Sequence, residues 1–281
     1  METTSLIAAR AAAYLALLFV AGLPLHALAA GQVLTLRARL GLVLLAIVAG
    51  LASAWWALES VAAMAGIGLD QLDQATVEVV LAQTPLGRVM EWRLTALFAV
   101  FLASILPLRR LRLPLLALGG AVALCSMAWT GHAGASAMPI HRAADVFHLM
   151  AAAVWLAALA MFGASSLSRN GPDIAALTHF ARTGSVVVAV LVLTGLLNTL
   201  SIAGWPMAFE ARWFTVLAVK LTLFVLMLGL AAGNRWRIVP SLEAGEPGAA
   251  ARLRISLAIE FAVGLGVVAA VALLGLLDPA A

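Results

Sequence analysis

Residues 142–163, RAADVFHLMAAAVWLAALAMFG, form an apolar run that is broken near its start by Asp145 and His148. A run of about 20 apolar residues is long enough to cross a bilayer as a helix. The apolar residues are continuous rather than alternating, which favours a helix over a barrel strand. We therefore predict a membrane-spanning helix that carries two polar side chains inside it.

Runs of the same kind recur along the whole chain of 281 residues, which is 64% hydrophobic and only 11% charged. Soluble domains carry roughly 25% charged residues, so we expect a bilayer to be the solvent of this chain. We predict an all-α integral membrane protein with about eight transmembrane helices in one polytopic domain over residues 1–281. The predicted spans are 7–29, 40–58, 93–108, 113–131, 142–163, 183–203, 213–232 and 255–276.

Arginines are unevenly divided between the two sides of these spans. Eleven lie in or beside the loops after the first, third, fifth and seventh spans, and five lie on the other side. The positive-inside rule then places those loops in the cytoplasm and both termini outside. This distribution also explains the net charge of +4 without a nucleic-acid partner. An alternative is a secretory signal cleaved near ALAAG at 27–31, which would leave seven spans and reverse the orientation.

The longest outer segment is 59–92, and it is acidic. Within it, TVEVVLAQ at 76–83 is typical of a short helix on the membrane interface. We interpret the segment as a solvated acidic loop, with a docking surface for a cationic or metal-carrying partner as the alternative. Its carboxylates are Glu59, Asp70, Asp73, Glu78 and Glu91.

Three of the five histidines gather where the fourth and fifth spans meet. His141, Asp145 and His148 are spaced i, i+4 and i+7, so they share one helix face. At 1.5 Å per residue, His148 lies roughly 9 Å below the start of its span, where a polar ring is costly without a partner or a function. Short connections make the two spans neighbours, which brings His132 toward the same face.

Imidazole and thioether groups together suit copper, and imidazole with carboxylate also suits zinc. We therefore predict a metal site formed by His132, His141, His148, Met138 and Asp145. The alternative is that His132 bonds loop carbonyls and Asp145 pairs with Arg142. The secondary candidates are Cys125, on the face of the fourth span, and His26 and His179, which together would form an exit site on the inner side.

Other polar groups lie inside the predicted spans. We expect Glu260 to meet Arg235 or Arg237 at the inner boundary. We expect Lys220 either to extend outward to the membrane interface or to face a polar cavity with Asn198 and Thr194. We interpret Lys220, Glu260, Asn198 and Asn234 as structural polar residues. The chain contains neither a phosphate-binding G-x-x-x-x-G-K-[ST] loop nor an H-E-x-x-H motif. We therefore expect neither an ATP-driven pump nor a membrane protease, and no enzyme.

Several stretches resemble the CopD/PcoD family of copper-resistance membrane proteins. They are WTGHAGA (129–135), HRAADVFHLMAAAVWLAAL (141–159), VLTGLLNT (192–199), KLTLFVLMLGLAAGNRWRIVP (220–240) and LRISLAIEFAVGLGVVAAVALLGLLDP (253–279). The resemblance covers residue 125 to the C-terminus well and the first half mainly through its pattern of spans. The motif positions that carry over are His132, Asp145, His148 and Asn234–Trp236.

The resemblance implies an eight-helix protein of the bacterial inner membrane that works with a periplasmic copper carrier of the CopC type. It implies copper import or delivery, with the oxidation state, Cu(I) or Cu(II), left open. One departure is that Ala157 and Ala158 stand where the family usually has glycines, which predicts altered helix packing. Two alternatives stay open: a b-type haem cytochrome, which needs two axial histidines on facing helices, and a copper-delivery assembly factor that does not transport.

Overall fold

The computed structural model describes residues 2–168, 171–204, 207 and 209–279. Across these ranges the chain forms helices and turns and contains no strand, as the continuous apolar runs predict. The long helices are α1 (Glu2–Ala29), α2 (Leu36–Ala65), α4 (Pro85–Ile105), α5 (Arg109–Cys125), α7 (Pro139–Ser166), α8 (Ile174–Ala203), α9 (Arg212–Gly233) and α11 (Ala249–Leu274). The short ones are η1 (Leu69–Gln71), α3 (Gln74–Gln83), η2 (Ser126–Trp129), α6 (Gly131–Ala135), η3 (Asn234–Ile238) and α10 (Val239–Glu243).

Seven helical segments in the described part of the chain are long and apolar enough to cross a membrane. They coincide with seven of the eight predicted spans. The counterpart of the remaining one, 93–108, is α4, which carries Arg88, Glu91 and Arg93 in its first half and is not among the seven. The protein is therefore an all-helical membrane protein, and α4 is the long helix that carries both acidic and basic residues in its first half.

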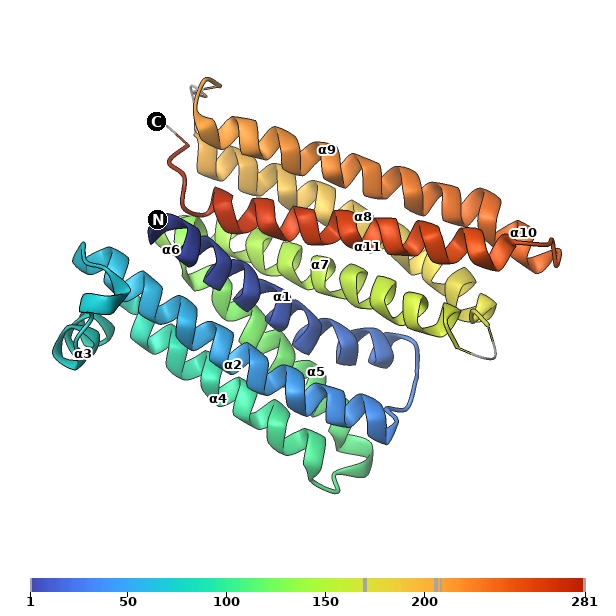
Figure 1. The fold of residues 1–281 in the computed structure, drawn as a ribbon, viewed down its shortest axis with the longest axis horizontal. Helices are drawn as coiled ribbons and strands as arrows, with labels where there is room; N and C mark the ends of the chain where they lie inside the picture. The colour runs from blue at the N-terminus through green and yellow to red at the C-terminus, as the bar shows by residue number, and fades with distance from the viewer. Residues whose placement is uncertain (1, 169–170, 205–206, 208, 280–281) are drawn as a thin grey trace.

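Arg93 shows how α4 packs inside the bundle despite its charges. Its side chain is fully buried, its Nε donates to Ser126 Oγ at 2.8 Å, and its guanidinium lies 4.9 Å from the ring centre of Trp56. A hydrogen bond and a cation–π contact offset part of the cost of burying this charge. α4 also lies beside α2 and α5 (Figure 1).

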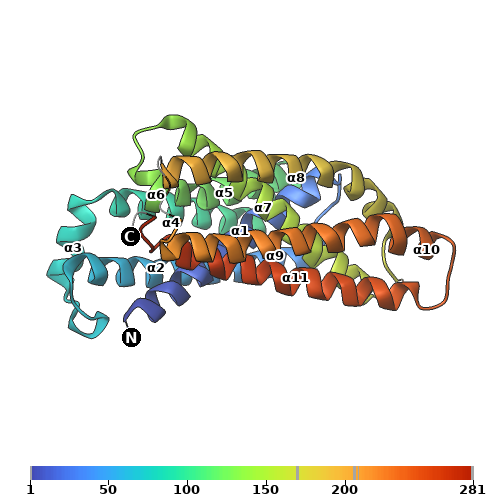
Figure 2. The same ribbon diagram turned by 90° about the horizontal axis from the view of Figure 1, so that it is seen from above.

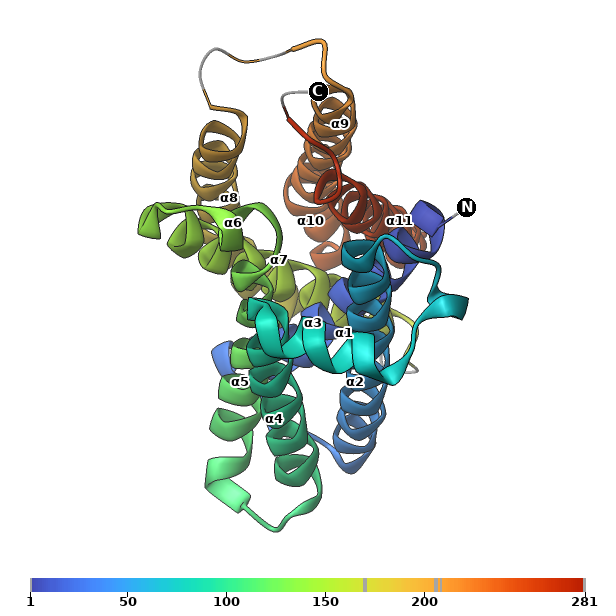
Figure 3. The ribbon, with the colours of Figure 1, turned by 90° about the vertical axis from the view of Figure 1, so that its left-hand side faces the viewer.

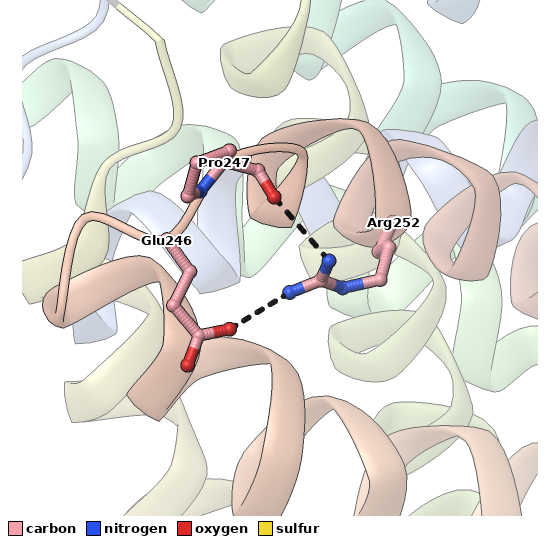
Figure 4. A network of polar contacts seen from close by, with 3 residues as sticks. All are labelled: Glu246, Pro247 and Arg252. Carbon is pink, nitrogen blue, oxygen red and sulfur yellow. Dashed lines mark hydrogen bonds and ion pairs between the residues drawn. The ribbon is translucent and has the colours of Figure 1, made fainter.

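The two ends of the bundle differ in what they carry. Both termini, α3 and α6 lie at one end, and α10 lies at the other (Figures 1 and 2). We call these the α3 end and the α10 end. At the α10 end, Arg252 pairs with Glu246 at 3.2 Å and also donates to the Pro247 carbonyl (Figure 4). This pair is exposed to solvent, so it contributes little to stability.

The acidic segment at the α3 end is shorter than the predicted loop 59–92. Residues 59–65 belong to α2 and residues 85–92 belong to α4, so the connection is 66–84. The helix predicted over 76–83 is present as α3, and Asp73 caps it by accepting from the Thr76 N–H at 2.7 Å. Glu59 is not a loop residue: it is buried in α2 and accepts hydrogen bonds from Ser5 and Trp55.

Small residues allow α1 to lie close to its neighbours at the centre of the bundle. A Cβ atom on Gly22 would lie 2.2 Å from the Ala153 carbonyl oxygen of α7. Close backbone approach of this kind is how helices pack in membranes. Ala157 and Ala158 are both fully buried, and Gly22 of α1 faces Ala157; the altered packing relative to the family stays a prediction.

α8 and α9 follow each other in the chain but do not pack together as a hairpin. α8 packs against α7, and α9 packs against α11. Figure 3 shows the two helices apart at the α3 end, joined only by their connecting segment. Two polar residues of α7, Asp145 and His148, contact α8 through Asn198 and Thr194.

Candidate functional site

The turn between α5 and α7 places two histidines side by side at the α3 end. Gly131 has φ +65°, a left-handed conformation that suits glycine, and it starts the short helix α6 that carries His132. His141 lies in the first turn of α7, and the two imidazoles are close enough to interact electrostatically. The structure thus brings together two of the three histidines that we predicted as ligands.

His141 is the most unusual polar residue of this region. Its side chain is 2% exposed, and neither ring nitrogen has a hydrogen-bond partner. Leaving a buried polar group unpaired costs about 1–3 kcal/mol, so such a group in a native protein calls for an explanation, and a bound ion is one such explanation. Both nitrogens of His141 are therefore open to a metal ion or another ligand.

His132 is half-buried between α6 and the end of the chain. Burial lowers the pKa of His132, and the positive charge of Arg10 lowers it further, while a hydrogen bond to the Leu277 backbone and the charge of Asp278 act in the opposite direction. The neutral imidazole, which is the form that binds metals, is favoured as a result.

Arg10 also belongs to this site. From the sequence we predicted only that it lies on the outer side of the membrane. It is buried in α1, and its Nη1 donates to the Gly275 carbonyl at 3.2 Å. The space for its guanidinium exists because positions 131 and 275 are glycines, where a Cβ atom would lie 3.1 Å and 2.1 Å from Nη2. An arginine within an apolar run was the available signal, but its partners come from the other end of the chain.

His148 lies one level deeper and faces α8 rather than the outer pair. Its Nδ1 lies 2.9 Å from Thr194 Oγ1, whose own proton goes to the Val190 carbonyl. Nδ1 is therefore the donor, and in the neutral ring Nε2 holds the lone pair that a metal needs. The ring also fits the space beside Gly195, where an added Cβ would lie 3.4 Å from Cε1. No second histidine among the described side chains faces it, as a haem would require.

Asp145 lies between α8 and α9. Its Oδ1 accepts from Asn198 Nδ2 at 3.3 Å, and its charge interacts with that of Lys220 on α9. Among the described residues, Asp145 forms no ion pair with Arg142, whose guanidinium instead lies 5.6 Å from the ring centre of Trp129. Lys220 interacts electrostatically with both Asp145 and His148, which contact Asn198 and Thr194, so these side chains belong to one polar region, as we expected.

The other predicted ligands lie around these two levels. Met138 is exposed just before α7, and Cys125 is a half-buried free thiol near the charge of Asp145. Within the part of the chain that the structure describes, no three His, Cys, Asp or Glu side chains converge tightly enough to hold a metal ion. The predicted five-residue ligand set remains a prediction, which the structure divides into an outer pair and a deeper level.

The predicted exit site lies partly outside the described side chains. His26 is buried in the last turn of α1, with its ring 5.6 Å from Phe162 and 5.8 Å from Phe180. The side chain of His179 is not among those described. The pairing of these two histidines therefore stays a prediction.

Glu260 does not have the partners that we expected. It contacts neither Arg235 nor Arg237; instead, its Oε1 accepts from Trp155 Nε1 at 3.0 Å and its Oε2 accepts from Asn234 Nδ2 at 3.1 Å. The expectation was wrong because the arginines of η3 point outward, whereas Asn234 is buried. Trp155 is seven residues after His148 in α7, so it lies on the same helix face.

Comparisons with known proteins agree with this architecture. The family model of the copper resistance protein D-like N-terminal domain matches residues 1–142, and that of copper resistance protein D matches residues 174–274. Copper resistance protein D of Pseudomonas syringae pv. tomato is 36% identical over 222 residues, which cover 72% of this chain and 71% of that protein. Inner membrane protein YebZ of Escherichia coli (strain K12) is 27% identical over 242 residues, covering 81% of this chain and 83% of that protein.

No solved structure matches the chain. The two family models together cover most of the helices described above, and most of α7 lies between the two matched ranges. By its apolar helices, its family models and its relatives, this chain belongs to the copper resistance protein D family and is a multi-pass inner-membrane protein.

Proposed function

We propose that this protein accepts copper from the periplasm at its α3 end, for import or for delivery within the membrane. The observation that carries the proposal is the buried, unpartnered ring of His141 next to His132. Two imidazoles with the exposed thioether of Met138 nearby form a donor set that suits copper as cargo. A site with fewer than three protein ligands leaves room for a donor from the protein that delivers the ion.

The proposed orientation rests on charge. Arg235, Arg237, Arg252 and Arg254 lie at the α10 end, which the positive-inside rule assigns to the cytoplasm. The α3 end, with both termini, then faces the periplasm, and the protein crosses the membrane eight times with α4 as one of the crossings. In this orientation the outer histidine pair is reached from the periplasm.

A small periplasmic copper carrier of the CopC type is the partner that we propose. The α3 segment presents Asp70, Asp73 and Glu78 at the end where the outer histidines lie. Exposed carboxylates attract a positively charged or copper-loaded surface and speed its encounter. The same segment would thereby hold the carrier next to His132 and His141.

Copper that leaves the outer pair meets His148 next. Its Nε2 lone pair and the carboxylate of Asp145 offer the following donors along the face of α7. We propose that mass action or an electrochemical gradient drives the movement, since the chain has no nucleotide-binding motif. The proposal assigns binding and transfer to these residues and no catalytic reaction.

The test is copper binding by the detergent-purified protein, with a visible spectrum of the same sample. We expect the H132A/H141A double variant to lose tight copper binding, with a loss of affinity of about 100-fold or more, since direct ligands outweigh the supporting residues that cost about 10–100-fold. Phe147→Ala, on the exposed side of α7, is the matched control and should bind normally.

Unchanged copper affinity in the double variant would overturn the proposed site. A Soret band in the purified protein would identify a haem protein instead. A protein that binds copper at the outer pair but moves none into vesicles would be a delivery factor rather than a transporter.

A further inference from the structure

A second polar site lies at the opposite end of the bundle and plays no part in the copper site. It is a cavity of about 530 Å³ enclosed by α7, α8, α9, η3, α10 and α11. Most of its wall is apolar, and its mouth includes the exposed side chains of Arg235, Trp236 and Glu243 at the α10 end. The volume is within the range of small-ligand sites and is ample for several water molecules.

Glu260 is the innermost charged group of this cavity. Its side chain is only 2% exposed, and each of its two oxygens accepts one hydrogen bond, from Trp155 and from Asn234. A carboxylate inside a membrane span is costly and usually serves the passage of ions or protons. Its two donors hold the carboxylate in one orientation at the cavity wall.

Asn234 is placed there by an irregular turn. Residues Asn234–Ile238 form a π-helical turn after α9, and such turns are frequent at functional sites. Asn234 is 9% exposed and lines the cavity, and its Oδ1 has no hydrogen-bond partner. Unpaired buried amide oxygens are uncommon in native proteins, so Oδ1 is an available acceptor at the wall of this cavity.

The amide of Asn234 suits both protonation states of the carboxyl group beside it. In the structure, the NH₂ group of Asn234 donates a hydrogen bond to Glu260 Oε2, and an ionised carboxylate can accept it. Turned by 180°, the amide would present Oδ1 to the same atom and accept a hydrogen bond from a protonated carboxyl. One side chain can thus satisfy Glu260 before and after it takes up a proton.

The donor set excludes copper as the ligand of this cavity. Its wall contains no His, Cys or Met side chain among the described residues, and carboxylate and amide oxygens are hard donors. The other charged groups on the wall are Arg235 from η3 and Glu243 from α10, while the described residues of α7, α8 and α11 add no charge besides Glu260. His26 of α1 lies behind the wall, against Phe162.

We propose that Glu260 is a reversible proton-binding site that is open to the α10 end and couples the movement of copper to the proton gradient. A hydronium ion in the cavity water transfers a proton to Oε2 and becomes water, a new O–H bond forms, and the amide of Asn234 turns so that its Oδ1 accepts a hydrogen bond from that O–H group. Release reverses the same step and returns the proton to water. The proton site stands on the geometry above, and only its coupling to copper rests on the proposed function.

The first experiment measures the proton site alone, by infrared pH-difference spectra of the full-length protein in detergent. We expect a band of a protonated carboxylic acid that is absent from E260Q and is retained in E243Q, the matched substitution at the mouth of the same cavity. Asn234→Leu should shift the pH midpoint of this band, whereas Asn198→Leu should not. An identical band in wild type and E260Q would overturn the proton site.

The second experiment measures coupling, with cuprous ion and vesicles that hold the full-length protein and a pH gradient. We expect copper movement to follow the gradient in wild type and to lose this dependence in E260Q, with copper binding at the outer histidines unchanged. Gradient-independent movement in wild type would overturn the coupling and leave the proposed function standing. Absence of outer copper binding would overturn the proposed function, while the infrared band would still decide the proton site.

Discussion

The two polar regions along α7 differ in whether their buried polar atoms have hydrogen-bond partners. At the α3 end, His141 is buried with both ring nitrogens unpaired, next to a second imidazole. Toward the α10 end, both oxygens of Glu260 are paired, and the one open group is the amide oxygen of Asn234. Open nitrogen donors suit a soft metal ion that arrives from outside, whereas paired oxygen acceptors suit a proton.

The difference shows that burial alone does not define a functional site. Glu59 and Arg93 are as deeply buried as these residues, but their contacts to Ser5, Trp55 and Ser126 fix helices against each other. Arg93 also has one unpaired nitrogen, Nη2, but both ring nitrogens of His141 are unpaired beside a second imidazole, and the unpaired oxygen of Asn234 belongs to a residue that lines a cavity. The following predictions test this distinction, in order of decreasing effect.

Gly22→Val should have the largest effect and should disturb both regions. A side chain at this position meets the Ala153 carbonyl and forces α1 away from α7, the helix that carries both sites. Overpacking of this kind costs about 3 kcal/mol. Thermal unfolding in detergent should show a lower midpoint, with weaker copper binding and a weaker infrared carboxyl band.

The matched control is Gly163→Val, at a position of α7 where an added Cβ meets nothing within 4 Å. This variant should unfold close to wild type. If Gly22→Val also unfolds like wild type, the close contact between α1 and α7 does not hold the two regions together.

Thr194→Val should affect the histidine region of α7 and leave the Glu260 region unchanged. It keeps the shape of the side chain and removes the oxygen to which His148 Nδ1 donates. Loss of a supporting hydrogen bond of this kind costs about tenfold in metal affinity. Nitrogen NMR of the histidines should show the Nδ1–H form of His148 in wild type and a mixture in the variant, and copper movement should slow about tenfold.

Thr199→Val removes a hydroxyl from the same helix, where it bonds only the Gly195 carbonyl among the described contacts. Its copper movement and the NMR signal of His148 should match wild type. Equal effects of the two threonine variants would show that loss of a hydroxyl from α8, rather than the His148 contact, is responsible.

Arg10→Gln should have the smallest effect, which is a change in the pKa of His132 at the outer site. Removing the positive charge raises the pKa of His132, because Arg10 lowers it in wild type. Burial is the larger cause and remains, so the pKa of His132 should stay below the ordinary value of 6.5. The imidazole should thus gain its proton at a higher pH in the variant than in wild type.

The measurement is the proton NMR titration of His132, assigned with His132→Asn. Arg88→Gln, which removes a charge from α4, should leave the titration unchanged. A pKa that falls or stays constant in Arg10→Gln would show that Arg10 does not set the charge of the outer pair.

The sequence predicted most of the helices but few of the partners inside the bundle. Seven of the predicted spans fall on helices that are long and apolar enough to cross a membrane, and α4 was predicted only from residue 93 onward because Arg88 and Glu91 interrupt the apolar pattern of its first half. The gathering of His132, His141 and His148 was visible from spacing. The division of these histidines into an outer pair and a deeper level could not be predicted. It depends on where α6 places His132 and on which face of α7 packs against α8.

The sequence by itself determined that this protein is helical, lies in a membrane and gathers histidines beside one turn, because transfer of an apolar run into lipid is a local property of that run. Only the tertiary structure decided which polar atoms are paired. Trp155 reaches Glu260 across 105 residues of sequence, and a π-helical turn brings Asn234 to the same carboxylate. Such contacts depend on the rotation and packing of whole helices, which hydrophobicity along the chain does not encode.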